Sequence, residues 1–298
     1  MSPAVALLKT IRPHQWVKNV FVAAPLVFSK HLTNPAFMTR TALAVLAFSL
    51  VSGAVYCFND VNDVEADRAH PKKQHRPIAA GALSERSALT AAALLAMIAF
   101  CISFALSWKL AAVLGIYAVQ NVAYSLRLKH VAFVDVGLIA LGFILRVLAG
   151  AFAIGVPASE WLIACTALLA TFLGFGKRAH ELAWADRTGG TTETRASLAG
   201  YSLPTVRIAM YTLAVATICV YIAYTLDAHV VEMFHTSRLV YSAPFVAIAM
   251  VRFIWLALWR PRDESPTEAM LKDPLFLLDL AAAVATILYV IYGGRHAG

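Results

Sequence analysis

Three aspartates follow an apolar segment in the first quarter of the chain: Asp60, Asp63 and Asp67 come directly after residues 41–58. On a continuous helix, a spacing of i, i+3 and i+7 places three carboxylates on one face. Such carboxylates repel one another unless a cation joins them, and Mg²⁺ commonly binds carboxylates together with a substrate phosphate. The motif therefore predicts a membrane-embedded enzyme that handles a diphosphate through Mg²⁺. Asp60, Asp63 and Asp67 are predicted as metal ligands, with Asn59 beside them in the catalytic set.

The alternative for these aspartates is a solvated, acidic helix end. Negative charge at a helix C-terminus interacts unfavourably with the helix dipole, so an acidic end with no bound cation would destabilise the helix. Basic residues near the motif favour the diphosphate instead, because arginine can clamp a phosphate with two parallel hydrogen bonds. The predicted substrate-binding residues are Lys18, Arg68, Arg76, Tyr124, Arg127, Lys129, Arg146, Lys177, Arg178 and Glu181.

Several of these residues have a plainer interpretation. Lys177 and Glu181 are four residues apart on one helix, a spacing that also suits a simple salt bridge. Tyr124 could be an interfacial aromatic residue. Arg146 lies in the middle of an apolar segment, where an arginine costs about 2.5–3.5 kcal/mol and normally faces a cavity with a partner. A phosphate or one of the three aspartates is the expected partner, and a purely structural arginine is the alternative.

Composition sets the class of protein. The chain has 298 residues, of which 60% are hydrophobic and 14% charged, and its mean hydropathy is +0.70. Soluble domains carry about 25% charged residues. The sequence therefore predicts one all-α, polytopic membrane domain over residues 1–298, with about nine helices. The net charge of +8 is ascribed to topology and anionic headgroups rather than to nucleic acid.

Nine segments are apolar enough to be candidates for spanning helices. They lie near 19–36, 41–58, 87–106, 109–126, 132–154, 159–176, 205–226, 239–259 and 274–293, and the first is the weakest. With nine helices, most Lys and Arg fall on the side of the N-terminus, which predicts a cytoplasmic N-terminus in a bacterial inner membrane. The long polar loops share that side, so the active site is expected to face the cytoplasm. The sequence leaves the oligomeric state open.

The motifs resemble those of a known family. Asn59-Asp60-x-x-Asp63-x-x-x-Asp67, followed by Arg76-Pro77-Ile78, is similar to the first aspartate-rich motif of the UbiA superfamily of intramembrane prenyltransferases. The usual second run of aspartates is replaced by Gly176-Lys177-Arg178-Ala179-His180-Glu181. Together with Arg12–Asn19 and Tyr124–Lys129, this pattern resembles the decaprenyl-phosphate phosphoribosyltransferase branch.

That resemblance implies a UbiA-like arrangement of about nine transmembrane helices around a central cavity. The same resemblance implies transfer of 5-phosphoribose from 5-phosphoribose-1-diphosphate (PRPP) to a long-chain polyprenyl phosphate, with Mg²⁺ as cofactor and release of diphosphate. It also implies that the product supplies arabinan precursors for cell wall biosynthesis. Two phosphorylated substrates in one site would need more cations and fewer carboxylates, which suits the altered second motif. Two alternatives remain open: a prenyltransferase that moves a prenyl group from its diphosphate to an aromatic or other acceptor, and a transporter of an anionic metabolite.

Overall fold

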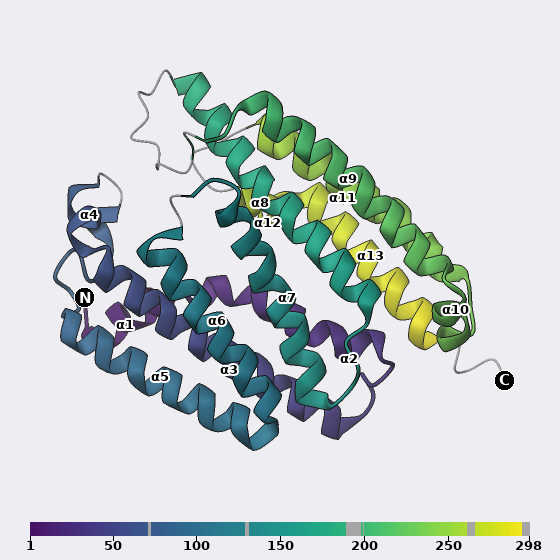
Figure 1. The fold of residues 1–298 in the computed structure, drawn as a ribbon, viewed down its shortest axis with the longest axis horizontal. Helices are drawn as coiled ribbons and strands as arrows, with labels where there is room; N and C mark the ends of the chain where they lie inside the picture. Colours follow the sequence, from purple (N-terminus) through teal and green to yellow (C-terminus); the bar gives the residue numbers. More distant parts are fainter. Residues whose placement is uncertain (71–72, 129–130, 189–197, 199, 261–265, 294–298) are drawn as a thin grey trace. The chain divides into compact units, whose positions relative to one another are not determined.

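A computed structural model describes residues 1–70, 73–128, 131–188, 198, 200–260 and 266–293. Within these ranges every long element is a helix (Figure 1), which confirms the all-α prediction. The chain divides into two compact units. The first comprises Met1–Lys129 and Gly142–Ala158, and the second comprises His130–Leu141 and Ser159–Gly298. The single domain over 1–298 stays a prediction.

The first unit is built around one long helix, α3 (Pro35–Asn62), which packs against α5 and α6 (Figure 1). Asn34 starts α3, because its side-chain oxygen accepts a hydrogen bond from the Ala36 N–H at 3.0 Å and Pro35 occupies the first helical position. The other elements of the unit are α1 (Pro3–Ile11), η1 (Pro13–Ala23), α2 (Ala24–Phe28), α4 (Val64–Ala69), η2 (Lys73–His75), α5 (Glu85–Leu106), α6 (Trp108–Leu126) and residues 142–154 of α7 (Val134–Ile154).

The core of the first unit lies along α3. Phe48, Leu110 and Leu114 are fully enclosed there. Gly150 of α7 is required for packing, because a Cβ atom at this position would collide with the backbone carbonyl of Val22 in η1. A close approach of two backbones is a common reason for a glycine inside a helix. The N-terminal segment is thereby held against the membrane helices of its own unit.

The second unit is a set of long helices joined by short ones. It contains residues 134–141 of α7, then α8 (Glu160–Thr188), α9 (Leu203–Leu226), α10 (Ala228–Phe234), η5 (Arg238–Ser242), α11 (Ala243–Leu258), α12 (Pro266–Leu271) and α13 (Pro274–Tyr292). Phe172, Met210 and Phe253 fill the core between α8, α9 and α11. Gly176 of α8 faces the Phe253 ring so closely that no larger residue fits without a shift.

Seven helices in the described part of the chain are long and apolar enough to cross a membrane: α3, α5, α7, α8, α9, Arg238–Leu258 and α13. The predicted count of nine is therefore not confirmed. Helix α6 is present but carries Lys109, Gln120 and Asn121, which lower its hydropathy. The segment near 19–36 is not one helix, because η1 gives way to the short α2 and Lys30 adopts a left-handed conformation with φ of 60°.

Two helix ends differ from the predicted ones in a way that matters for the site. The segment predicted at 41–58 continues to Asn62, so Asp60 lies inside a helix. The apolar segment predicted at 159–176 continues as a helix to Thr188, so Lys177, Arg178 and Glu181 lie on α8, in agreement with the helical spacing of Lys177 and Glu181. Polar residues at these ends are positioned by helices, which hold side chains more rigidly than loops do.

Candidate active site

Two buried carboxylates meet where α3 ends. Asp60 is 3% exposed and Asp67, from α4, is 1% exposed. A single guanidinium nitrogen of Arg76 joins them, 3.3 Å from Asp60 Oδ1 and 2.6 Å from Asp67 Oδ2. Arg76 follows η2, so the chain folds back after α4 to bring this cation to the two acids. The predicted association of Arg76 with the aspartate motif is thus present in the folded chain.

A second arginine reaches the same cluster from the N-terminus. The guanidinium of Arg12 pairs with Asp60 Oδ1 and lies 5.0 Å from the centre of the Tyr56 ring. Arg12 separates α1 from η1 in a left-handed conformation with φ of 53°, and Pro13 after it disfavours further α-helix. Lys73 adds a third positive charge, with its Nζ 3.9 Å from Asp67 Oδ1. The cluster therefore combines two enclosed carboxylates with three cations that are each partly exposed.

The third aspartate of the motif sits differently from the prediction. The helix is interrupted at Asp63, whose φ and ψ of −94° and 7° separate α3 from α4. The three carboxylates therefore do not share one face of a continuous helix. Asp63 is half-buried, and its Oδ1 lies 3.3 Å from the side-chain nitrogen of Asn62. The break lets α4 turn back, and this turn is what places Asp67 beside Asp60.

The cluster suits a hard cation that is shared with a ligand. In the described part of the chain, no three His, Cys, Asp or Glu side chains converge to form a complete metal cage. Mg²⁺ seldom needs one, because it takes one or two carboxylates and completes its shell with water and phosphate oxygens. Asn59 supports such a ligand: its side-chain oxygen is buried and has no hydrogen-bond partner in the described structure. The residues present therefore fit a partly coordinated divalent cation.

A second cluster of charged groups lies in the second unit. Arg178 and Asp135 are both 0% exposed, and Arg178 Nε lies 2.6 Å from Asp135 Oδ2. Arg178 also pairs with Glu181, one helical turn further along α8. The enclosed guanidinium is thus held between two carboxylates. To bind a phosphate directly, Arg178 would have to give up contacts that are expensive to break in a buried site.

Tyr201 completes this second cluster. Its hydroxyl donates a hydrogen bond to Asp135 Oδ1 at 2.7 Å and accepts one from the Phe133 N–H at 2.6 Å. Phe133 has a left-handed backbone with φ of 67°, so the Tyr201 hydroxyl secures an unusual turn just before α7. Burial, together with the hydrogen bond to Asp135, raises the pKa of Tyr201 well above its ordinary value. The hydroxyl therefore stays protonated at neutral pH and remains a donor.

Arg146 occupies a buried position in α7, within the first unit. Its guanidinium donates to Asn19 Oδ1 at 2.9 Å, to the Gly142 carbonyl at 2.8 Å and to the Tyr117 hydroxyl at 3.2 Å. The Phe48 ring lies 5.0 Å away. These partners are all uncharged. The sequence predicts either a phosphate or one of the three aspartates as the partner of Arg146, and none of the three aspartates contacts it. The described structure therefore leaves a buried positive charge without a carboxylate beside it.

The remaining predicted residues are less closely gathered. Arg68 pairs with the exposed Glu65 at 2.8 Å instead of with Asp60 or Asp67. Arg127 is exposed, whereas Lys18, Tyr124 and Lys177 are half-buried. Lys129 lies outside the described residues. The substrate-binding roles of all these residues stay predictions.

The structure brings three residues into the two clusters that the sequence does not single out as site residues. Arg12 is visible in the sequence only as part of the Arg12–Asn19 motif, yet it pairs with Asp60. Asp135 lies in the first turn of α7, a common place for an acidic residue, yet it is the main partner of Arg178. Tyr201 carried no signal, because its contact with Asp135 spans 66 residues of the chain.

Comparisons with known proteins agree with these features. A profile of the UbiA prenyltransferase family matches residues 19–292. The decaprenyl-phosphate phosphoribosyltransferase of Mycolicibacterium smegmatis is 34% identical, over 96% of this chain and 92% of its own. The protein of the same name from Corynebacterium glutamicum is 33% identical, over 97% of this chain and 87% of its own.

Solved structures extend the likeness to the fold. The structure of a UbiA homolog from Archaeoglobus fulgidus bound to GPP and Mg²⁺ superposes with a TM-score of 0.71, covering 96% of this chain and 99% of that chain. Its sequence identity is 18%, so this likeness concerns the fold alone. The family resemblance predicted from the aspartate motif is confirmed. This chain belongs to the UbiA prenyltransferase family.

Proposed function

We propose that the protein transfers 5-phosphoribose from PRPP to a long-chain polyprenyl phosphate and releases diphosphate in a Mg²⁺-dependent reaction. The observation that carries this proposal is the cluster at the end of α3, where Arg12 and Arg76 surround the buried pair Asp60 and Asp67. A site that binds a phosphorylated donor beside a phosphorylated lipid needs this mixture of carboxylates and cations. The names of the relatives that match nearly the whole chain support the same reaction.

Asp60 and Asp67 would hold Mg²⁺ together with the diphosphate of PRPP, and Asp63 and Asn59 would support them. When bound, Mg²⁺ would reduce the negative charge of the leaving diphosphate. Arg76 and Arg12 would then donate some of their hydrogen bonds to phosphate oxygens instead of to the carboxylates.

The chemical step exchanges one C–O bond for another. The bond between ribose C1 and the diphosphate oxygen breaks, and an oxygen of the lipid phosphate forms the new bond to C1 from the opposite face. Positive charge develops at C1 and the ring oxygen in the transition state. The lipid phosphate is already an anion at pH 7, so no strong general base is required. Most of the rate would come from positioning and charge neutralisation.

Basic residues would hold the two remaining phosphates. We assign the 5-phosphate of the donor to Lys177 and Lys129, as expected from the sequence, and we give Arg178, which is held by Asp135 and Glu181, a positioning role. The lipid phosphate is assigned to Lys18 and Arg146. Arg146 supports this assignment because its charge meets only uncharged partners in the described structure, so an anion would offset the cost of burying it.

The cellular setting follows from the same reasoning. Seven apolar helices among the described residues, together with family membership, indicate a multi-pass membrane protein. We place it in a bacterial inner membrane with the N-terminus and the active site facing the cytoplasm, where a soluble diphosphate donor is available. The lipid product would serve cell wall biosynthesis as an arabinan precursor.

A transfer assay with full-length protein in detergent tests the proposal. The reaction would contain labelled PRPP, polyprenyl phosphate and Mg²⁺, and the product would be extracted into organic solvent. We expect a labelled lipid that is lost when EDTA is added. No labelled lipid, together with turnover of a prenyl diphosphate on an aromatic acceptor, would overturn the proposal and assign the chain to ordinary prenyl transfer.

A further inference from the structure

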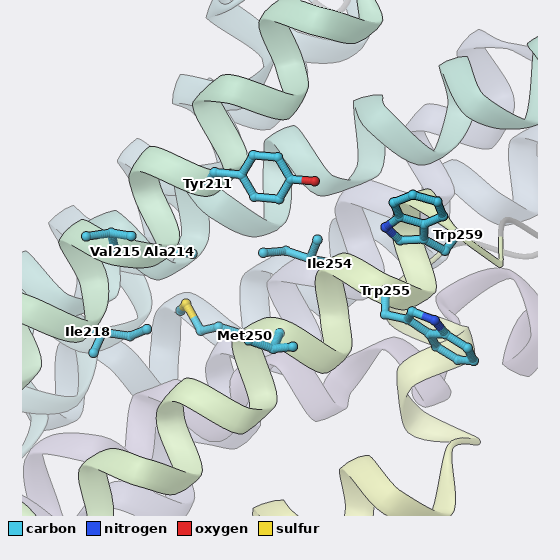
Figure 2. A pocket seen from close by; sticks show the side chains of 9 residues that line it. Tyr211, Ala214, Val215, Ile218, Met250, Ile254, Trp255 and Trp259 are labelled. Carbon is cyan, nitrogen blue, oxygen red and sulfur yellow. The ribbon is translucent and has the colours of Figure 1, made fainter.

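A groove runs along the second unit between α9 and α11 (Figure 2). It has a volume of about 400 Å³. The side chains that define it are Tyr211, Val215 and Ile218 from α9 and Met250, Trp255 and Trp259 from α11. Figure 2 shows Trp255 and Trp259 together at one end, which we call the tryptophan end, and Ile218 towards the other. None of these residues belongs to either charged cluster described above.

The groove is open along one side. Ala214 and Met250 are buried at 6% and 3% exposure, whereas Val215 and Val251 are 62% and 66% exposed. In a membrane protein, apolar side chains with this exposure face lipid. A hydrocarbon chain from the bilayer could therefore enter the groove sideways, without any movement of α9 or α11.

The tryptophan end carries positive charge. The guanidinium carbon of Arg260 lies 4.8 Å from the centre of the Trp255 ring. An Arg187 nitrogen donates to the Trp259 carbonyl at 3.0 Å, which brings the end of α8 to the same place. No carboxylate pairs with Arg260 among the described residues. Arg207, four residues before Tyr211, lies on the same side of α9 one turn closer to this end.

A further arginine beside the same ring has a different role. The guanidinium carbon of Arg252 lies 4.3 Å from the centre of the Trp255 ring. However, Arg252 Nε and Nη2 donate to Asp273 Oδ1 and Oδ2, at 3.0 and 2.7 Å. Asp273 in turn caps α13. Arg252 is thus paired with a carboxylate, while Arg260 on the same ring has no carboxylate partner among the described residues.

We propose that this groove binds an anionic phospholipid of the bilayer, with one acyl chain between α9 and α11 and its phosphate at Arg260 and Arg187. The apolar length of the groove matches an acyl chain, and its positively charged tryptophan end matches the phosphate. Tryptophan at the junction of apolar and polar regions is typical of the membrane interface, and arginine recognises phosphate through charge-assisted hydrogen bonds. The site is independent of the proposed reaction, because no residue of it is assigned to either substrate.

Lipid binding can be measured without any assay of activity. The full-length protein would be reconstituted in nanodiscs, and the lipid retained after detergent extraction would be identified by native mass spectrometry. The probes are dioleoyl phosphatidylglycerol, dioleoyl phosphatidylcholine and polyprenyl phosphate. Arg260→Ala removes the phosphate contact. Val215→Trp fills the groove from its exposed rim without disturbing the core, and Arg238→Ala removes an exposed arginine at the other end of the η5–α11 helix as a matched control.

We expect preferential retention of phosphatidylglycerol, with affinity reduced about tenfold by Arg260→Ala, as for loss of one charge-assisted hydrogen bond. Val215→Trp should reduce retention of the same lipid, and Arg238→Ala should leave it unchanged. Equal retention of phosphatidylcholine, or retention unaffected by both groove variants, would overturn the proposal. Polyprenyl phosphate bound in preference to phosphatidylglycerol would overturn it too, because the groove would then belong to the acceptor substrate.

Discussion

The two charged clusters differ in how firmly their arginines are held. In the first unit, Arg12 and Arg76 are 24% and 29% exposed and approach the buried acids from outside. In the second unit, Arg178 has no exposed surface and sits between Asp135 and Glu181. A partly exposed arginine can exchange a carboxylate partner for a ligand, whereas an enclosed arginine stabilises a fixed arrangement of the helices around it. We therefore assign substrate chemistry to the first cluster and positioning to the second.

The largest effect should come from the buried carboxylate of the first cluster. Asp60→Asn keeps the size of the side chain but removes its charge, and transfer activity should fall about a thousandfold, in the range seen when a key electrostatic group is lost. Glu65→Gln is the matched control, because Glu65 is 83% exposed, and it should keep activity within twofold. An Asp60→Asn enzyme with activity near that of the native protein would contradict the proposed metal role.

The second cluster should respond in stability more than in chemistry. Arg178→Met leaves Asp135 buried without its ion-pair partner, which should lower the free energy of unfolding by about 3 kcal/mol. Denaturant unfolding in detergent measures the loss. Adding Asp135→Leu to Arg178→Met should recover most of it, since the uncompensated charge is then gone. A stable Arg178→Met protein whose only defect is a raised KM for PRPP would instead place Arg178 in direct contact with substrate.

Arg76, which joins the two buried aspartates of the first cluster, should affect donor binding more than stability. Arg76→Lys keeps the charge but replaces the planar guanidinium, whose Nη1 joins Asp60 and Asp67, with an ammonium group of different geometry. We expect the KM for PRPP to rise about tenfold, in line with loss of one hydrogen bond to a charged group, with a smaller change in kcat. Steady-state kinetics at saturating polyprenyl phosphate would separate the two parameters. An unchanged KM for PRPP would remove Arg76 from the proposed donor site.

The smallest effect is expected at the turn before α7. Tyr201→Phe removes one hydrogen bond to Asp135 and one from the Phe133 N–H, and the free energy of unfolding should fall by about 1–2 kcal/mol. Activity per folded molecule should be preserved, because the Arg178–Asp135 pair remains. Loss of activity in a fully stable Tyr201→Phe protein would show that the hydroxyl acts in the reaction itself.

Much of this arrangement could be read from local sequence, and the rest depends on contacts between distant segments. Asp60 and Asp67 stand out because acids seldom follow an apolar segment so closely, and Arg76 is only nine residues from Asp67. The Arg12–Asp60 pair spans 48 residues and the Asp135–Tyr201 bond 66, and no local pattern encodes such contacts. The break at Asp63 was also missed, because a continuous helix satisfies the same hydrophobic pattern.

The ends of the membrane helices could also be predicted only in part. Long apolar segments such as α5 and α13 were located to within a few residues, since hydropathy alone defines them. The segment near 19–36 was not, because Pro25 and the left-handed Lys30 divide it. Helix α8 extends beyond its predicted end because its last turns combine charged residues such as Arg178 and Glu181, which pair with each other, with only a few buried apolar residues such as Ala179.

Binding of PRPP to the full-length protein in detergent tests the donor site at the buried aspartates. It would be measured by titration calorimetry with and without Mg²⁺ and without lipid acceptor. We expect Mg²⁺-dependent binding that is lost in Asp67→Asn and retained in Glu65→Gln. Binding of PRPP that is unchanged by Asp67→Asn, or that needs no divalent cation, would contradict a donor site built on the buried aspartates of the first cluster.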